Sequence, residues 1–411
     1  MPEGLNGAFA VGFAGLLIRR ERLKRDWSQK GLCSGICTIS YLSKIEQGKA
    51  EPSQEVLTLL LDRLGVTWHT GEIAQRAQTL AEELFDAFCS MDKGREQELL
   101  QELDRHREEY INSAAMLDLL IQEPLCAGEP CPELEPFVPV MDERQQGLWL
   151  LLEERCEEAF QLLPLPVTSA MAGLSDYREG RYSRARQRLQ RAFDQAAEQC
   201  RPYLMLFCRT ILGNCASDLN DYPDTLYHYT AAERLAKALG EEGYLRDIRY
   251  NLASTQMQFG RYEEAYGYFR QVEAPTIMDL HKLAICCEGL GRGQEALATL
   301  DRAEQTDSQM PHRELALMMC HVVRYRLEHP NYLKDEGYGA MLMDCMAQLR
   351  KELPVGYAAF HLPWMEEWYT ANRQYKQALE LLKEFPGDVA FSRIKSGKTG
   401  LIFPNQGDIQ N

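Results

Sequence analysis

The sequence predicts an all-α protein in which a small basic helical domain precedes a long stack of helical hairpins. Long stretches are rich in Leu, Ala, Glu, Arg and Gln at helical spacing, and few segments alternate as strands do. The 411 residues are 45% hydrophobic and 26% charged, which is typical of a globular chain too long for one ordinary core. Two or three folded units are therefore expected.

Charge is distributed unevenly along the chain. Residues 15–50 contain eight basic and three acidic side chains, a net +5. The whole chain carries −16, so the remainder carries −21. The total charge argues against nonspecific binding of nucleic acid by the whole molecule. A basic head on an acidic body is typical of a DNA reader with a separate sensing body.

The first two helices are predicted between residues 15 and 35. In "GLLIRRERLKRDW" the apolar residues are spaced as one helix face, with arginines on the outer face, and the helix begins inside the apolar run 8–18. Ser28 is placed to cap a very short second helix centred on Leu32. Gly35 is expected to close that helix and turn the chain.

A third and a fourth helix follow. Thr38 is placed to cap "ISYLSKIEQ", Leu42 and Ile45 point inward, and Gly48 ends the helix. Ser53 then caps a helix with one apolar stripe. Short helices joined by a tight turn, the latter exposing small polar and basic side chains, are typical of a helix-turn-helix.

"WSQKGLCSGICTISYLSKIEQGKAEPS" resembles the XRE (Cro-type) helix-turn-helix family over about 50 residues. The residues that match its pattern are Ser28, Gln29, Leu32, Leu42, Ser43, Ile45, Glu46, Gly48, Pro52 and Ser53. The turn "CSGIC" is one residue shorter than the usual pattern, a departure from the family just before the expected base-contacting positions.

This resemblance implies double-stranded operator DNA as a partner. Gln29 would contact the phosphate backbone, Ser40, Tyr41 and Lys44 would face DNA, and Glu46 would pair with an arginine of the first helix. The candidate DNA-binding set is Gln29, Thr38, Ser40, Tyr41, Ser43 and Lys44. A helical domain that has lost DNA binding remains an alternative.

The body of the chain contains internal repeats. Segments 174–192, 214–232, 254–272 and 285–303 align, and 367–385 follows after a gap. Each has a helix, a polar turn often ending in Tyr, and a second helix. Small residues recur three positions after the turn, as Ala185, Thr225, Ala265, Ala296 and Ala378, and nine before it, as at Gly213. Such positions let two helices approach closely, as in stacked hairpins.

The pattern resembles the tetratricopeptide repeat, although the turn tyrosines Tyr182, Tyr222 and Tyr262 are 40 apart rather than 34. Residues 73–122 and 141–163 are predicted to be helical, and the proline-containing 122–140 to be a loop. The predicted domains are an N-terminal tail at 1–14, the head at 15–68, the repeats at 72–388 and a C-terminal extension at 389–411.

Stacked hairpins form a superhelix whose concave face is lined by the first helix of each pair. Asn214 and Asn251 are expected to point inward on adjacent repeats, where an amide can donate and accept hydrogen bonds with a peptide backbone. The candidate ligand-binding set is Arg209, Asn214, Tyr250, Asn251, His281, Lys282 and Trp364. For each of these residues a purely structural role remains an alternative.

Other signals are weak. The 13 cysteines are odd in number and irregularly spaced, so we expect buried thiols in a reducing cytoplasm and no zinc site. "SGKT" at 396–399 lacks the preceding glycine of a phosphate-binding loop. No catalytic constellation is present, so no enzyme, metal or cofactor is expected. The apolar N-terminal run is too short to span a bilayer.

An XRE-like head on repeats resembles the peptide-pheromone-sensing (Rgg/PlcR-like) regulators of Gram-positive bacteria. The resemblance implies a cytoplasmic homodimer, a short peptide in the concave groove, and a transcriptional response to that peptide through the spacing of two heads on DNA. One alternative is a scaffold whose repeats dock a protein ligand. Another is a regulator that responds to redox state through its cysteines.

Overall fold

The computed structural model describes residues 12–128, 131–306, 311–385 and 387–388, and all regular secondary structure within them is helical. The chain divides into two compact units, which we call unit 1 (to Ser169) and unit 2 (from Ala170). Most of the predicted tail at 1–14 and all of the predicted extension at 389–411, including "SGKT", lie outside the described residues.

Unit 1 begins with the predicted four-helix head. Its helices are α1 (Phe13–Lys24), α2 (Gln29–Cys33), α3 (Ile39–Glu46) and α4 (Gln54–Leu64). Ser28, Thr38 and Ser53 each accept a hydrogen bond from the backbone N–H three residues later, which confirms the predicted caps. Gly35 and Gly48 have φ of 75° and 66°, so the turns after α2 and α3 use the backbone conformation that favours glycine.

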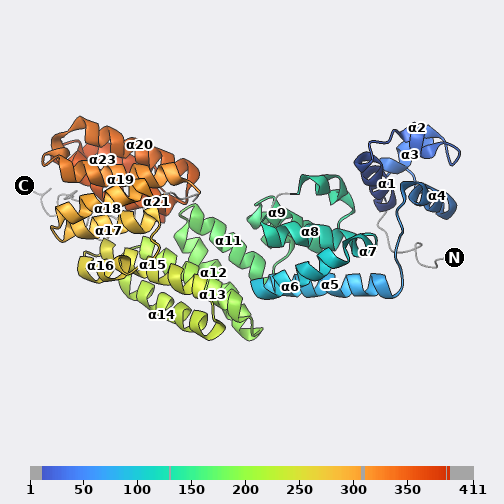
Figure 1. Ribbon diagram of the computed structural model, residues 1–411, viewed down its shortest axis with the longest axis horizontal. Coiled ribbons are helices and arrows are strands. Elements are labelled where there is room, and N and C mark those ends of the chain that lie inside the picture. Colours follow the sequence, from blue (N-terminus) through green and yellow to red (C-terminus); the bar gives the residue numbers. More distant parts are fainter. Residues whose placement is uncertain (1–11, 129–130, 307–310, 386, 389–411) are drawn as a thin grey trace, which may run out of the picture. The chain divides into compact units, whose positions relative to one another are not determined.

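The rest of unit 1 is also helical, as Figure 1 shows. It contains α5 (Glu72–Ser90), α6 (Lys93–Arg105), α7 (Arg107–Ile111), α8 (Met116–Ala127), η1 (Pro132–Val140), α9 (Glu143–Leu152) and α10 (Cys156–Leu162).

The prediction of a loop at 122–140 is wrong. Helix α8 continues through Pro124 to Ala127, and the 3-10 helix η1 covers the segment from Pro132 to Val140. Phe137 is buried, and its ring centroid lies 6.2 Å from that of Phe13 in α1. Burial of apolar side chains therefore orders a proline-rich segment whose local sequence favours a loop.

Unit 2 is a succession of helical hairpins (Figure 1). Its helices are α11 (Pro166–Arg178, which begins just before the unit), α12 (Tyr182–Glu198), α13 (Pro202–Asp218), α14 (Tyr222–Leu239), α15 (Glu242–Gln258), α16 (Tyr262–Arg270), α17 (Ile277–Gly289), α18 (Gly293–Gln305), α19 (Arg313–Glu328), η2 (Tyr332–Lys334), α20 (Glu336–Glu352), α21 (Val355–Phe360), α22 (Leu362–Ala371) and α23 (Tyr375–Lys383).

The predicted small residues lie where paired helices meet. All five that follow the turns are buried. A Cβ atom on Gly213 of α13 would come within 2.4 Å of Cε1 of Tyr229 in α14. Glycine is therefore required there by the packing of Tyr229, and the repeat pattern read from the sequence describes real hairpins.

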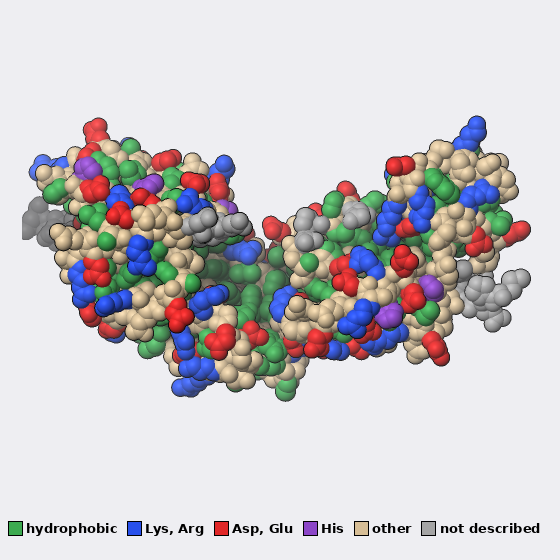
Figure 2. Space-filling model, in the orientation of Figure 1, with side chains coloured by type: hydrophobic (Ala, Val, Ile, Leu, Met, Phe, Trp, Pro, Cys, Tyr) green, Lys and Arg blue, Asp and Glu red, His purple; other side chains and the backbone are tan. Residues whose placement is uncertain are grey.

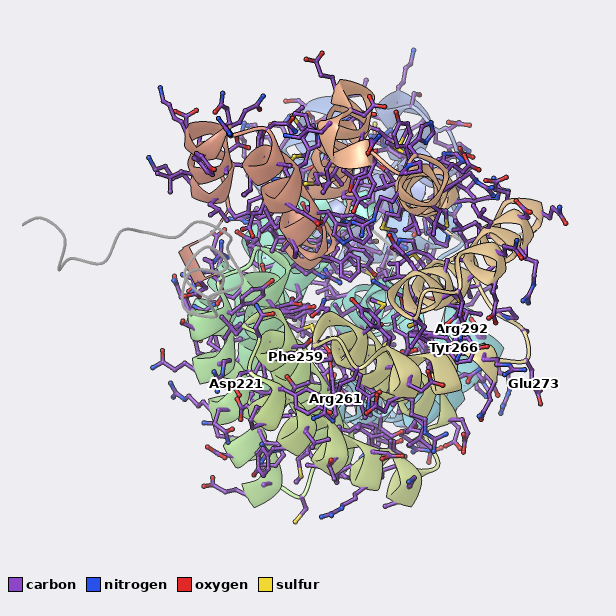
Figure 3. All side chains as sticks on the ribbon, turned by 90° about the vertical axis from the view of Figure 1, so that its left-hand side faces the viewer. Asp221, Phe259, Arg261, Tyr266, Glu273 and Arg292 are labelled. Carbon is purple, nitrogen blue, oxygen red and sulfur yellow. The ribbon has the colours of Figure 1, made fainter. Side chains whose placement is uncertain are left out.

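Arginine side chains at two hairpin turns of unit 2 contact aromatic rings of the preceding hairpin. Figure 3 shows Phe259 and Arg261 side by side at the turn before α16. The guanidinium carbon of Arg261 lies 4.8 Å from the ring centroid of Tyr222, the first residue of α14. That of Arg292 lies 4.5 Å from the ring of Tyr266 (Figure 3). Such cation–π contacts stabilise the stacking of neighbouring hairpins.

The outer surface of unit 2 carries interspersed acidic and basic side chains on the face that Figure 2 shows. Within the described residues, the helices are all too short or too polar to cross a membrane.

Candidate functional sites

Helix α3 presents a polar surface beside its N-terminus. Thr38, Ser40 and Lys44 are exposed. Thr38 uses its hydroxyl to cap α3, accepting from Tyr41 N at 3.2 Å. Within the described residues the side chains of Ser40 and Lys44 make no hydrogen bond or ion pair, so both are available to a ligand. A short hydroxyl and a flexible ammonium on an exposed helix face suit the edges and phosphates of duplex DNA.

The other three predicted DNA-binding residues are half-buried and hydrogen-bonded inside the head. The Gln29 amide donates to Glu46 Oε2 at 2.8 Å, and the Tyr41 hydroxyl donates to the carbonyl of Glu51 at 3.0 Å. The Ser43 hydroxyl accepts from the Gln47 amide at 3.1 Å. These bonds hold α3 and its exit loop in place. Contacts of the three residues with DNA stay a prediction.

A buried ion pair orients α3. Arg22 of α1 donates from Nε to Glu46 Oε1 at 2.7 Å and from the guanidinium NH2 group to Glu46 Oε2 at 2.8 Å. Arg22 is 8% exposed and Glu46 is 2% exposed. The hydrogen bond to Glu46 raises the pKa of Arg22 further above its usual value. The expected partnership of Glu46 with an arginine of the first helix is confirmed.

Sequence reasoning missed Ile39 on this surface. It directly follows the cap Thr38, and its side chain is 47% exposed although it is large and apolar. Apolar side chains at such a place contact the methyl group of thymine in the major groove. Its spacing of three residues from Leu42 predicts a position on the inward face of the helix, so no sequence signal indicated its exposure.

Unit 2 contains a pocket of about 140 Å³, which we call the asparagine pocket. Its walls come from helices of successive hairpins and from α21. It is lined by Tyr177, Asn214, Ser217, Asp218, Tyr229, Tyr250, Asn251, Ser254, Gln258, Met278, Lys282, Met319, Gly356, Tyr357 and Phe360.

Two amides of adjacent repeats meet in this pocket. The Asn214 Oδ1 atom accepts from the Tyr229 hydroxyl at 2.7 Å and from Asn251 Nδ2 at 3.2 Å. Within the described residues nothing bonds to Asn214 Nδ2 or to Asn251 Oδ1. The pair therefore offers one donor and one acceptor at fixed positions, which is what a peptide backbone requires. The prediction that both asparagines point inward is confirmed, while a role in binding stays a prediction.

A second polar contact joins the same two helices. The hydroxyls of Ser217 in α13 and Thr255 in α15 lie 2.7 Å apart, and Thr255 also donates to the backbone carbonyl of Asn251. This arrangement locks the helices that carry the asparagines, so the amides are held in place before any ligand arrives.

Tyr250 and Lys282 also line the asparagine pocket, whereas Trp364 lines an adjoining pocket of about 370 Å³. Gln258 and Phe360 line both pockets. The two pockets are therefore neighbours, and four of the seven predicted ligand-binding residues line the first of them.

Arg209 and His281 do not line the asparagine pocket. The guanidinium carbon of Arg209 lies 3.9 Å from the ring centroid of Phe193, and its NH1 atom lies 3.1 Å from Nδ1 of His228. His281 is fully buried beside His361, with ring centroids 6.5 Å apart. Burial lowers the pKa of His281 well below its usual value and that of His361 to about 3. Both imidazoles are therefore neutral at pH 7.

The wall formed by α21 was also missed. Gly356, Tyr357 and Phe360 approach the asparagine pocket from a helix that begins 97 residues after the end of α15. A Cβ atom on Gly356 would lie 2.8 Å from Asp218 Oδ2 at the end of α13. The segment has no repeat register, so no sequence signal indicated that it meets the first hairpins.

Comparison with known proteins supports this picture of the fold. A family model described as helix-turn-helix matches residues 18–69. No curated protein sequence matches the chain. The structure of a Rap protein complexed with competence and sporulation factor has a TM-score of 0.61 at 14% identity, covering 79% of this chain and 99% of that one.

Two structures of the quorum sensor NprR are also similar. The apo form from B. thuringiensis has a TM-score of 0.53 at 15% identity, covering 76% of this chain and 100% of that one. NprR in complex with its cognate peptide NprX has a TM-score of 0.52 at 15% identity, covering 75% and 99%. At these identities the likeness is one of fold. The chain is all-α, with an N-terminal XRE-type helix-turn-helix domain and tetratricopeptide-like helical repeats, as the sequence predicts.

Proposed function

We propose that this protein is a sequence-specific DNA-binding transcriptional regulator whose unit 2 senses a short signalling peptide in the asparagine pocket. The observation that carries the proposal is the pair of amides described above. Asn214 Nδ2 and Asn251 Oδ1 have no hydrogen-bond partner among the described residues, both residues line one pocket, and the same chain carries a helix-turn-helix domain.

The chemistry of the pocket favours a peptide over a small polar metabolite. An extended peptide presents carbonyl and N–H groups in a regular order, so Asn214 can donate to one and Asn251 can accept from the other. Tyrosine, phenylalanine and methionine side chains line the remaining walls and suit apolar side chains. The NprR complex with NprX supports this choice, since a protein of similar fold there is in complex with a peptide.

The head provides the DNA-binding part of the proposed function. We propose that Ser40 and Lys44 contact operator DNA while the ion pair between Arg22 and Glu46 fixes the angle of α3. Proteins with this motif read two half-sites as dimers. We therefore propose a cytoplasmic homodimer in which the bound peptide favours one spacing of the two heads.

The alternative of a redox-responsive regulator is not favoured by the state of the cysteines. All 13 lie in the described residues, none of them forms a disulfide, and Cys200 alone is exposed. Burial raises the pKa of Cys208, Cys286 and Cys320 to about 12. Reactive cysteines need the opposite, a thiolate at neutral pH. The scaffold alternative is separated from the proposal by the peptide experiment below.

The DNA half of the proposal is tested by selecting bound duplexes from a random pool with the purified full chain. We expect a palindromic consensus that is lost in a Ser40→Ala, Lys44→Ala variant. The control is Lys376→Ala, which removes the same charge from an exposed position of α23. If the control also loses the consensus, the effect is due to net charge, which contradicts the assignment of α3 as the DNA-contacting helix.

The peptide half is tested with a soluble mixture of random heptapeptides, retained by the protein on ultrafiltration and identified by mass spectrometry. We expect wild type to retain a subset and Asn251→Ala to lose it. Asn251 is preferred to Asn214 as the site of change, because Tyr229 keeps its hydrogen-bond acceptor. The control is Gln190→Ala, at a half-buried position of α12 that does not line the asparagine pocket. If wild type retains no peptide, the sensing function is refuted and the scaffold alternative is favoured.

A further inference from the structure

The asparagine pocket contains a buried amine, that of Lys282, which pairs with no carboxylate of the described residues. Lys282 of α17 is 7% exposed and lines the pocket. Its Nζ atom lies 3.4 Å from the ring centroid of Phe360, which is a cation–π contact. Across the described chain, none of the carboxylates pairs with Nζ and none of the hydrogen-bond acceptors contacts it.

The groups that face Lys282 do not neutralise its charge. His281 and His361 are neutral because they are buried, and Cys286 is a protonated thiol whose pKa is about 12. Asp218 lines the same pocket and accepts from the Tyr182 hydroxyl at 2.9 Å, but its carboxylate forms no ion pair with Lys282. Burial lowers the pKa of Lys282 to about 7, so the amine is only partly protonated at neutral pH.

A structural role alone does not account for a lysine at this position. Buried lysine is rare unless it is paired, since desolvation of the ammonium is unfavourable and an apolar side chain of the same length fills the space equally well. The contact with Phe360 offsets only part of that cost. The charge of the ammonium group is balanced only when a negatively charged group enters the pocket beside it.

We propose that the asparagine pocket selects peptides that place a carboxylate against Lys282, while Asn214 and Asn251 hold the adjacent backbone. The carboxylate comes from the peptide C-terminus or from an Asp or Glu side chain. This inference rests on the proposed peptide-sensing function and names the class of peptide that the site takes.

A linkage with pH follows. A bound carboxylate favours the protonated amine, so binding at alkaline pH requires uptake of one proton. Affinity is therefore nearly constant below pH 7. It falls above pH 7 by up to tenfold for each pH unit, because the protonated fraction of free Lys282 falls.

The test uses two random heptapeptide mixtures, one with free and one with amidated C-termini, offered to the full chain. Wild type is expected to retain mainly peptides with a carboxylate, and the two mixtures show whether it is terminal or in a side chain. Lys282→Met keeps the length and packing of the side chain, and it is expected to lose this preference while still retaining peptides. Lys282→Arg stays charged at all working pH values, and it is expected to keep the preference and lose the pH dependence.

The outcomes separate the inference from the function on which it rests. A wild type that retains peptides without preference for a carboxylate overturns the inference alone, as does a preference that survives in Lys282→Met. A wild type that retains no peptide overturns both. Affinity that is independent of pH between 6 and 9 in wild type, with Lys282→Arg unchanged from it, also overturns the inference.

Discussion

Substitution of Glu46 by Ala is expected to destabilise the head selectively. The carboxylate accepts both hydrogen bonds of the Arg22 fork and one from Gln29. After the substitution the guanidinium keeps only its bond from NH1 to the carbonyl of Trp27, at 2.6 Å. The Arg22 charge then remains buried at 8% exposure without its counter-ion.

The magnitude follows from this geometry. Removal of one partner of a buried ion pair costs about 3–5 kcal/mol, because it leaves an uncompensated charge. Arg22 lies close enough to the surface for water to reach it after local movement, so the lower figure of about 3 kcal/mol is appropriate. At about 1.4 kcal/mol per factor of ten, this corresponds to roughly a 150-fold loss in the folding equilibrium of the head. Glu46→Gln keeps the shape of the side chain and is expected to lie between wild type and Ala.

Hydrogen exchange followed by mass spectrometry measures the effect, because it reports α1–α4 separately from unit 2. Protection in α1–α4 should fall by about two orders of magnitude in Glu46→Ala, while protection in α12–α16 stays at the wild-type level. Asp62→Ala is the control, since Asp62 is exposed at the end of α4 and makes no side-chain bond in the described structure. Protection in α1–α4 that stays within threefold of wild type would refute the role of the ion pair.

Two further predictions concern unit 2. Gly213→Ala should lower the unfolding free energy of unit 2 by about 1–2 kcal/mol despite the helix propensity of alanine, because its Cβ would come within 2.4 Å of Tyr229. The control is Gly267→Ala in α16, where the added Cβ enters open space and should stabilise unit 2 slightly. Equal urea midpoints for the two variants would contradict this prediction. The pKa of His361 is about 3 in the folded chain and about 6.5 in the unfolded chain. Between these values the unfolded chain binds a proton that the folded chain excludes, so the unfolding free energy falls as the pH drops below 6.5. From pH 7.5 to 5 this residue alone should remove about 2 kcal/mol, and a urea midpoint whose pH dependence is the same in His361→Phe would refute the assignment.

Local sequence was sufficient to predict the head. Ser28, Thr38 and Ser53 act as caps through bonds to N–H groups three residues away, and Gly35 and Gly48 adopt the conformation that favours glycine. These features depend on neighbours within one turn of helix, so a single sequence specifies them. The DNA-facing side chains were less predictable, since Tyr41 and Ser43 bond within the head and Ile39 is exposed.

The pocket depended on contacts that no local pattern records. The repeat period placed Asn214 and Asn251 on adjacent first helices, which was enough to bring them together. The α21 residue Phe360 has no period to place it, yet it contacts Lys282 and lines both pockets. The loop predicted at 122–140 failed for the same reason, since burial of Phe137 against Phe13 is a contact between residues 124 positions apart.

The two sites have in common that their exposed groups are held by partners on the inner side. In the head, Gln29 and Arg22 use up the carboxylate of Glu46 and so fix α3, which leaves Ser40 and Lys44 free on the outside. In the pocket, Tyr229 and Asn251 use up the oxygen of Asn214 and leave its N–H2 group free. Recognition groups held in this way lose little conformational freedom when a ligand binds, so more of the contact energy remains as affinity. Lys282 differs, because among the described residues its amine contacts the ring of Phe360 but no carboxylate. Its positive charge is balanced when a negatively charged ligand binds. The asparagines therefore position any peptide, and the lysine is the group that distinguishes one peptide from another.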